Sequence, residues 1–294
     1  MIAGKKLNIV LHIVFIIFAV CCLFPILLTL GISLSSSTSI IENGYSLIPK
    51  EFSVEAYKYI FTDSTKIIRA YGITIFNAVV GSTLSVLIIA HLAYPLSRSD
   101  FKLRKPITFY VLFTMLFNGG QVASYMVITT MYHLQNTIWV MIIPCMMNAW
   151  YMVVLRTFFK TGVPTAIIES GKLDGAGEMR ILWQLVFPIA LPGIATIALF
   201  QVLMYWNEWN LPLLYIVDPK LYNLQFLLQQ MMQNIQQLHE NTEFAQQATA
   251  EMAKIPSESA RMALCFVAMG PILITYPFFQ KYFIQGLTVG SVKE

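Results

Sequence analysis

The sequence predicts an all-α, polytopic membrane protein with six transmembrane helices and both termini in the cytoplasm. Hydrophobic residues make up 57% of the 294 residues and charged residues only 12%, whereas soluble domains carry roughly 25% charged residues. Six apolar segments have about the 20 residues that a helix needs to cross a bilayer. Lys and Arg residues gather in alternate connecting segments, as they do in cytoplasmic loops. This composition excludes a soluble enzyme and a disordered chain.

Each of the six apolar segments is expected to form one span. They lie at residues 9–32, 71–96, 106–131, 137–158, 186–211 and 261–283. The first is longer than the hydrophobic region of a signal peptide, which has roughly 7–15 residues, so we interpret it as a retained span. The last contains Pro271 and Pro277, which a membrane helix tolerates when its neighbours satisfy the freed carbonyls.

The placement of Lys and Arg orients these spans. With the N-terminus inside, the inside segments carry twelve Lys and Arg residues and the longer outside segments carry seven. The net charge of +4 is therefore explained by cytoplasmic loops and does not indicate a nucleic-acid partner. The outside segments 33–70 and 212–260 are either solvated connectors or the outer mouth of a pathway. Helical stretches are expected within the second, around 223–237 and 242–253.

Residues for catalysis or metal binding are not apparent. The four cysteines lie inside apolar runs and the four histidines are scattered, so we expect no metal site and no cofactor. The chain has no paired-carboxylate or Ser/His/Asp motif and no GxxxxGK[ST] nucleotide-binding loop. We therefore expect no catalytic residues, and any ATP that drives the protein must be hydrolysed by another chain.

The connection between the fourth and fifth spans has the strongest local pattern. Pro164 suits the first turn of a helix, Gly175 suits a helix end, and a second short helix is expected over 178–186. The segment therefore predicts a helix–turn–helix on the cytoplasmic surface. Small residues in it allow another surface to approach closely; they are Ser170, Gly171, Gly175, Ala176 and Gly177. The alternative is an amphipathic connector that rests on lipid headgroups.

This segment, ESGKLDGAGEMRILWQLVFPIALPG, resembles the EAA loop of binding-protein-dependent ABC importer permeases of the carbohydrate class. The matching positions are Glu169, Leu173, Asp174, Gly175, Ala176, Pro188 and Pro192. Ser170 and Gly171 replace the two alanines that are usual in the family, and Gly171 should loosen the first short helix. Residues 117–144, 205–215 and 256–294 resemble the same branch of the family, so the resemblance covers about residues 65–294.

The resemblance implies the type I importer permease fold and a role for the EAA loop at 160–187. In the family this loop docks into the ATP-hydrolysing subunit and transmits its motion. The residues implied here are Glu169, Ser170, Gly171, Asp174, Gly175 and Ala176. The corresponding division of the chain is an N-terminal helix and outer loop (1–70), a permease core (71–285) and a cytoplasmic tail (286–294).

The resemblance also implies a set of partners in a bacterial cell membrane. These are a second permease subunit that completes a heterodimer, two copies of a nucleotide-binding ATPase subunit, an extracytoplasmic solute-binding protein, a carbohydrate substrate and the lipid bilayer. Six spans are few for enclosing a wide polar solute, which is a separate reason to expect a second permease subunit. No nucleic-acid partner is expected.

Polar residues at membrane depth are candidates for the translocation path, because an ionisable group there costs about 2.5–3.5 kcal/mol on insertion scales. Glu208 lies among tryptophans and amides, which suits a sugar, but such residues also gather at membrane interfaces. Glu208 also has the alternatives of headgroup water or a pair across a subunit interface. The candidates are Asn77, Asn118, Gln121, Asn148, Asn207, Glu208 and Asn210. Hydrogen bonds between helices explain the amides at least as well.

The function that these observations predict is the permease subunit of an ABC importer for oligosaccharides or polysaccharides. One alternative keeps the importer and changes the solute to a non-sugar. The other is a secondary carrier that works alone, which would require carboxylates or lysines in several spans, or inverted repeats. The spans contain one carboxylate and no obvious repeat.

Overall fold

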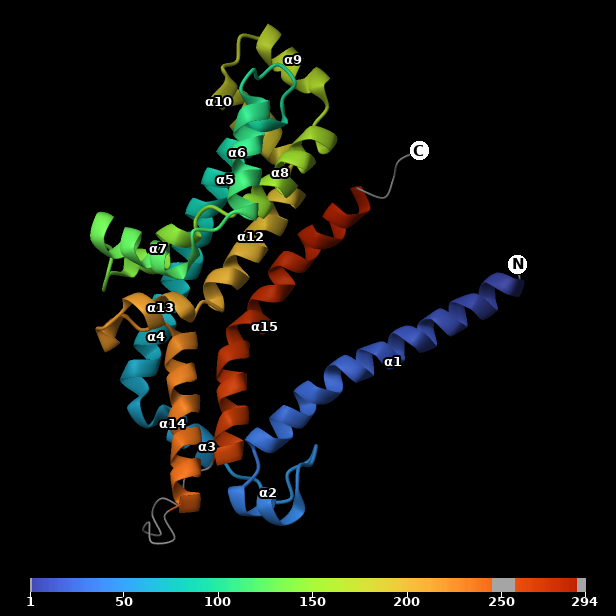
Figure 1. The fold of residues 1–294 in the computed structure, drawn as a ribbon. Helices are drawn as coiled ribbons and strands as arrows, with labels where there is room; N and C mark the ends of the chain where they lie inside the picture. Colours follow the sequence, from blue (N-terminus) through green and yellow to red (C-terminus); the bar gives the residue numbers. More distant parts are fainter. Residues whose placement is uncertain (1, 245–256, 290–294) are drawn as a thin grey trace. The chain divides into compact units, whose positions relative to one another are not determined.

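The computed structural model describes residues 2–244 and 257–289. Within these residues the chain is helical between its loops, with one isolated antiparallel bridge between Ser35 and Phe52 and no strand, which confirms the all-α prediction. The chain divides into two compact units. Unit 1 comprises Met1–Ile67 and Leu228–Gly270, and unit 2 comprises Ile68–Leu227 and Pro271–Glu294. Figure 1 follows the helices by colour along the chain.

Unit 1 holds the first helices and parts of two late ones. They are α1 (Ile2–Ser33), α2 (Ser37–Asn43), α3 (Glu55–Ile60) and η1 (Phe61–Asp63), with most of α14 (Leu224–Phe244) and the first part of α15 (Ser257–Val289). The hydroxyl of Ser36 accepts the Ser39 N–H at 3.1 Å and so begins α2. Helix α14 confirms the helix expected around 223–237. The stretch 242–253 lies mostly outside the described residues.

Unit 2 contains the other described helices, among which α9 and α10 form the predicted EAA loop. They are α4 (Ser64–Phe76), η2 (Asn77–Gly81), α5 (Ser82–Ser97), α6 (Arg104–Leu116), α7 (Gly120–Met126), η3 (Val127–Met131), η4 (Ile138–Met141), η5 (Ile143–Cys145), α8 (Ala149–Gly162), α9 (Thr165–Leu173), α10 (Glu178–Ile181), η6 (Leu182–Val186), α11 (Phe187–Ile189), α12 (Leu191–Trp206), α13 (Asn210–Tyr215) and η7 (Pro219–Leu221). Helices α5, α8 and α12 pack side by side, and α9 and α10 lie at one end of this group (Figure 1).

Apolar side chains from several helices form the core of unit 2. Ile89 of α5, Leu155 of α8 and Ile181 of α10 are completely buried, and Ile197 of α12 lies in the same cluster. The cluster therefore joins the short helix α10 to the longer helices. Rigid packing of this kind allows a displacement at α10 to be passed to the helices beneath it.

Two of the described helical segments are long and apolar enough to cross a membrane, namely Leu7–Ser33 and Ser64–Ser97. Three further pairs of helices meet this standard only when a bent pair is counted as one span. The pairs are Arg104–Leu116 with Gly120–Met131 (bent by 112°), Ile138–Cys145 with Ala149–Gly162 (48°), and Glu178–Ile189 with Leu191–Trp206 (85°). The described residues thus offer up to five spans by length and composition. The sixth predicted segment, 261–283, lies within α15.

The bends fall where the sequence interrupts a helix. The third predicted span breaks at Asn118, whose side-chain oxygen accepts the Gly120 N–H at 2.8 Å while Gly120 has a φ of +84°. Glycine adopts this left-handed backbone without the steric cost that other residues meet. The bend before α12 lies at Ala190, between Pro188 and Pro192. The third, fourth and fifth predicted spans therefore each correspond to a bent pair of helices, a feature that the prediction of one span per segment did not include.

Candidate functional site

The predicted EAA loop folds as a helix–turn–helix, as the sequence indicated. Helix α9 ends at Leu173, and Gly175 turns the chain with a φ of +75°. The Asp174 N–H donates to the Ser170 carbonyl at 3.0 Å, and the Ala176 N–H donates to the Gly171 carbonyl at 2.9 Å. These bonds satisfy carbonyls that would otherwise have no partner at the end of a helix. The turn between α9 and α10 is therefore well defined.

The predicted contact residues are mostly on the surface of this motif. Glu169, Ser170, Asp174 and Gly175 are exposed, and Ala176 is half-buried. Beside them, the apolar side chain of Leu173 is 89% exposed. An exposed leucine flanked by two carboxylates on a short, firmly held turn is suited to contact with another protein.

Gly171 differs from the other predicted contact residues because it is buried. A Cβ atom at this position would lie 2.8 Å from Cδ1 of Leu185 and 3.4 Å from Cγ1 of Ile181. The glycine therefore lets α9 approach the helical segment that begins at Glu178. Its role in the structure is close packing within the motif, whereas the sequence suggested that Gly171 loosens the first short helix and, as a small residue, lets another surface approach.

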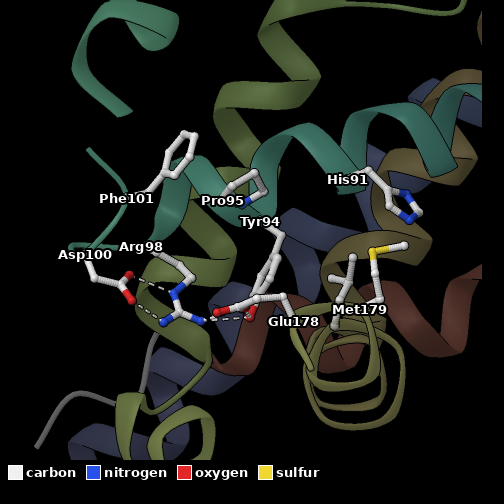
Figure 2. A pocket seen from close by; sticks show the side chains of 9 residues that line it. His91, Tyr94, Pro95, Arg98, Asp100, Phe101, Glu178 and Met179 are labelled. Atoms are coloured by element: carbon white, nitrogen blue, oxygen red, sulfur yellow. Dashed lines mark hydrogen bonds and ion pairs between the residues drawn. The ribbon is translucent and has the colours of Figure 1, made fainter. Parts of the chain in front are cut away.

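A ring of four charged side chains holds this motif against the loop between α5 and α6. Arg98 makes a bidentate pair with Asp100, with distances of 2.6 and 2.9 Å, and also donates to Glu178 at 3.0 Å. Lys172 lies 3.1 Å from both Asp100 and Glu178. The Tyr94 hydroxyl donates to Glu178 at 2.9 Å and accepts from Arg98 (Figure 2). Each cation thus contacts both carboxylates.

These contacts shift the pKa values of the ring. Hydrogen bonding from Arg98 holds the pKa of the Asp100 carboxyl well below its usual value. Partial burial acts to raise the pKa of Glu178, but hydrogen bonds from Lys172 and Tyr94 outweigh it, and the pKa is lowered. The hydrogen bond with Glu178 raises the pKa of Lys172. All four groups therefore remain charged near neutral pH.

Two cavities lie on either side of this ring. One of about 350 Å³ is lined by residues that include His91, Pro95 and Met179 (Figure 2). The other, of about 310 Å³, is lined by residues that include Lys160 and Glu169. Arg98 and Asp100 line both cavities. Glu178 also lines the first cavity and Lys172 the second, so all four members of the ring border a cavity.

The residues predicted for the translocation path lie on several elements of the structure. Asn77 is buried, and its amide contacts the Met141 sulfur at 3.5 Å, whereas Asn118 and Gln121 are exposed. Asn148 accepts the Tyr151 N–H at 3.3 Å and so caps α8. The structure thus gives several of these amides local roles within or between helices.

Glu208 has a local role too. Its carboxylate accepts the N–H groups of Asn210 and Leu211, both at 2.8 Å, at the start of α13. The Asn207 amide donates to the Leu203 carbonyl at 2.8 Å. Glu208 therefore caps α13. This role was not among those expected for it, which were solute contact, headgroup water and a pair across a subunit interface.

The charged ring and the buried carboxamide of Gln201 were not predicted from the sequence. Both polar atoms of Gln201 lack a hydrogen-bond partner within the described part of the chain. Arg98 and Asp100 stand two residues apart in the sequence, which hints at a local pair. Nothing in the sequence indicates that Lys172 and Glu178 join them.

Comparison with known proteins identifies the class of this protein. The chain is 34% identical to the polygalacturonan/rhamnogalacturonan transport system permease protein YtcP of Bacillus subtilis, over 95% of each chain. It is 33% identical to the protein LplC of the same organism, covering 92% of this chain and 89% of LplC. A comparison with models of protein families finds no match.

The fold agrees with a solved structure. A chain in the crystal structure of a bacterial ABC transporter involved in the import of the acidic polysaccharide alginate matches with a TM-score of 0.79 and 26% identity, over 96% of this chain and 98% of that chain. The match covers nearly the whole all-helical fold, including the helix–turn–helix loop, and defines the class as a membrane permease together with the two relatives. This chain belongs to the permease subunits of sugar ABC transport systems.

Proposed function

We propose that this chain imports oligosaccharides or polysaccharide fragments as one half of an ATP-driven permease. The supporting observation is the geometry of the α9–α10 motif, which presents Glu169, Leu173 and Asp174 outward on a turn fixed by Gly175. Its fixed turn and its packing on the helical core suit transmission of force from another subunit. The relatives named above act in sugar and polysaccharide transport, which supports the substrate class.

The proposed assembly follows from this role. A second permease subunit completes the path, two copies of an ATPase subunit hydrolyse the ATP, and an extracytoplasmic binding protein delivers the solute. In this proposal the chain has six spans, and both termini and the α9–α10 motif lie in the cytoplasm of a bacterial cell. The motif is then on the side of the membrane where ATP is available. In this proposal residues 1–70 form an N-terminal transmembrane helix with its outer loop, residues 71–285 the permease core and residues 286–294 a cytoplasmic tail.

Reconstitution of the complete complex in proteoliposomes tests this proposal. ATP inside the vesicles, with the binding protein outside, should drive uptake of an oligosaccharide derived from polygalacturonan or alginate. Neutral maltodextrin and an amino acid serve as comparison solutes. Uptake of the amino acid alone, or transport by this chain in the absence of ATP and partners, would contradict the proposal.

A variant at the proposed contact surface connects the activity to the geometry. Leu173→Glu should abolish co-purification of the ATPase subunit, because it replaces an exposed apolar contact with a third carboxylate beside Glu169 and Asp174. Met179→Glu is the matched control, since Met179 is also apolar and exposed but belongs to α10 and not to the turn. Equal loss in both variants would argue against a specific contact at the turn.

A further inference from the structure

The charged ring connects three segments that are far apart in the sequence. Arg98 and Asp100 belong to the loop after α5, Lys172 to the last turn of α9, and Glu178 to the first turn of α10. The contacts Asp100–Lys172 and Arg98–Glu178 span 72 and 80 residues. Because the ring has two positive and two negative members, it is balanced in charge and closed on itself.

The ring is well placed to carry force. Tyr94 lies in the last turn of α5 and bonds both Arg98 and Glu178, so the end of α5 is tied directly to α10. The Arg98 side chain is only 12% exposed, and charge-assisted bonds of this kind are stronger than neutral ones. The covalent path from α10 to α12 bends by 85°. The ring gives a second route, through side-chain contacts, from the motif to the end of α5.

We propose that Arg98, Asp100, Lys172 and Glu178 are positioning residues that couple the α9–α10 motif to the end of α5. This proposal rests on the proposed function and extends it. When the ATPase subunits move the motif, the ring makes the end of α5 move with it, so that two membrane segments respond to one displacement. Without the ring, α9 and α10 move while α5 follows only through apolar packing.

The experiment compares the number of solute molecules transported per ATP hydrolysed by the reconstituted complex. Lys172→Gln and Asp100→Asn each remove one charge from the ring, and Lys172→Arg retains it. Arg180→Gln is the matched control, because Arg180 is an exposed cation that bonds Gln184 within its own helical segment at 3.0 Å. The amount of ATPase subunit that co-purifies with each variant reports on assembly separately.

The expected result is a loss of about fivefold in transport per ATP for Lys172→Gln and for Asp100→Asn, within the range of typical coupling between sites. Lys172→Arg and Arg180→Gln should retain the ratio of the unmutated complex. The double variant Asp100→Asn with Lys172→Gln should lose less than the product of the two single losses, because the two substitutions share the Asp100–Lys172 contact. Co-purification of the ATPase subunit should be unchanged in all of them.

Three results would overturn the inference. They are an unchanged ratio in both single variants, multiplied losses in the double variant, or loss of the ATPase subunit from Lys172→Gln, which would mean that Lys172 serves docking. In each case a transporting unmutated complex leaves the proposed function intact. An unmutated complex that takes up no sugar would overturn the proposed function, and this inference with it.

Discussion

Gly175 and Gly177 stand two residues apart in the turn between α9 and α10 but have different backbones. Gly175 has a φ of +75°, whereas Gly177 has a φ of −71°, and a Cβ atom at either position would meet no atom within 4 Å. Gly175→Ser should therefore destabilise the purified complex by about 1–2 kcal/mol through backbone strain alone. Gly177→Ser should change its stability by less than about 0.5 kcal/mol. Denaturant unfolding in detergent measures both, and equal effects would contradict the strain argument.

Gly81 and Gly72 differ in the space that is available for a side chain. A Cβ atom at Gly81 would lie 2.5 Å from the ring of the buried Tyr205, whereas Gly72 has open space around it. Gly81→Ala should cost about 1–3 kcal/mol by overpacking. Gly72→Ala, on helix α4, should stabilise the protein by up to about 1 kcal/mol. Denaturant unfolding in detergent measures the stability of both variants. An unchanged stability of Gly81→Ala would contradict the overpacking argument and mean that Tyr205 moves easily.

Single residues were predictable from the sequence where the cause is local. The left-handed turn at Gly175 follows from a glycine placed directly after a helical stretch, and the structure confirms it. The roles of Gly171 and Gly81 depend on Leu185 and Tyr205, which approach them only in the folded chain. Glu208 is an exception, because its carboxylate caps α13 through Asn210 and Leu211, two and three residues further on, yet the neighbouring tryptophans and amides suggested solute contact.

At the scale of elements, the charged ring should be insensitive to pH across the neutral range. The pKa values of Asp100 and Glu178 are lowered in the folded protein, so their contribution to stability is present above their usual values of 3.8 and 4.5 and is lost on acidification through the lowered values. The pKa of Lys172 is raised from 10.5, so its contribution is lost only as the pH rises through that raised value.

The expected outcome is a constant effect of Lys172→Gln on transport per ATP between about pH 5 and pH 9, because no member of the ring titrates there. Proteoliposome assays at several pH values across this range, with Arg180→Gln run in parallel, measure it. If the Lys172→Gln defect appeared only above pH 7, a group outside the ring would control the contact.

The sequence was sufficient to predict that the elements are helices. The breaks inside them and the contacts between them were harder to predict. An average over about 20 residues identifies the apolar segment 106–131 and hides the Asn118–Gly119–Gly120 break inside it. The breaks at Pro188 and Pro192 were visible as prolines, yet membrane helices often continue through proline. The ring was hidden because its members join across 72 and 80 residues, and hydropathy carries no information on such pairs.

At the scale of the whole molecule, the orientation in the membrane is the prediction on which the proposed function depends. Leu173 and Ile48 are both highly exposed, at 89% and 81%, so in cells that express this chain without the ATPase subunit a cysteine at either position is open to reagents. If the positive-inside rule holds here, Leu173 lies in the cytoplasm and Ile48 outside. In a variant whose four native cysteines are replaced by serine, Ile48→Cys should react with a membrane-impermeant maleimide in intact cells. Leu173→Cys should react only in inside-out vesicles, and the reverse pattern would place the α9–α10 motif beyond the reach of any ATPase.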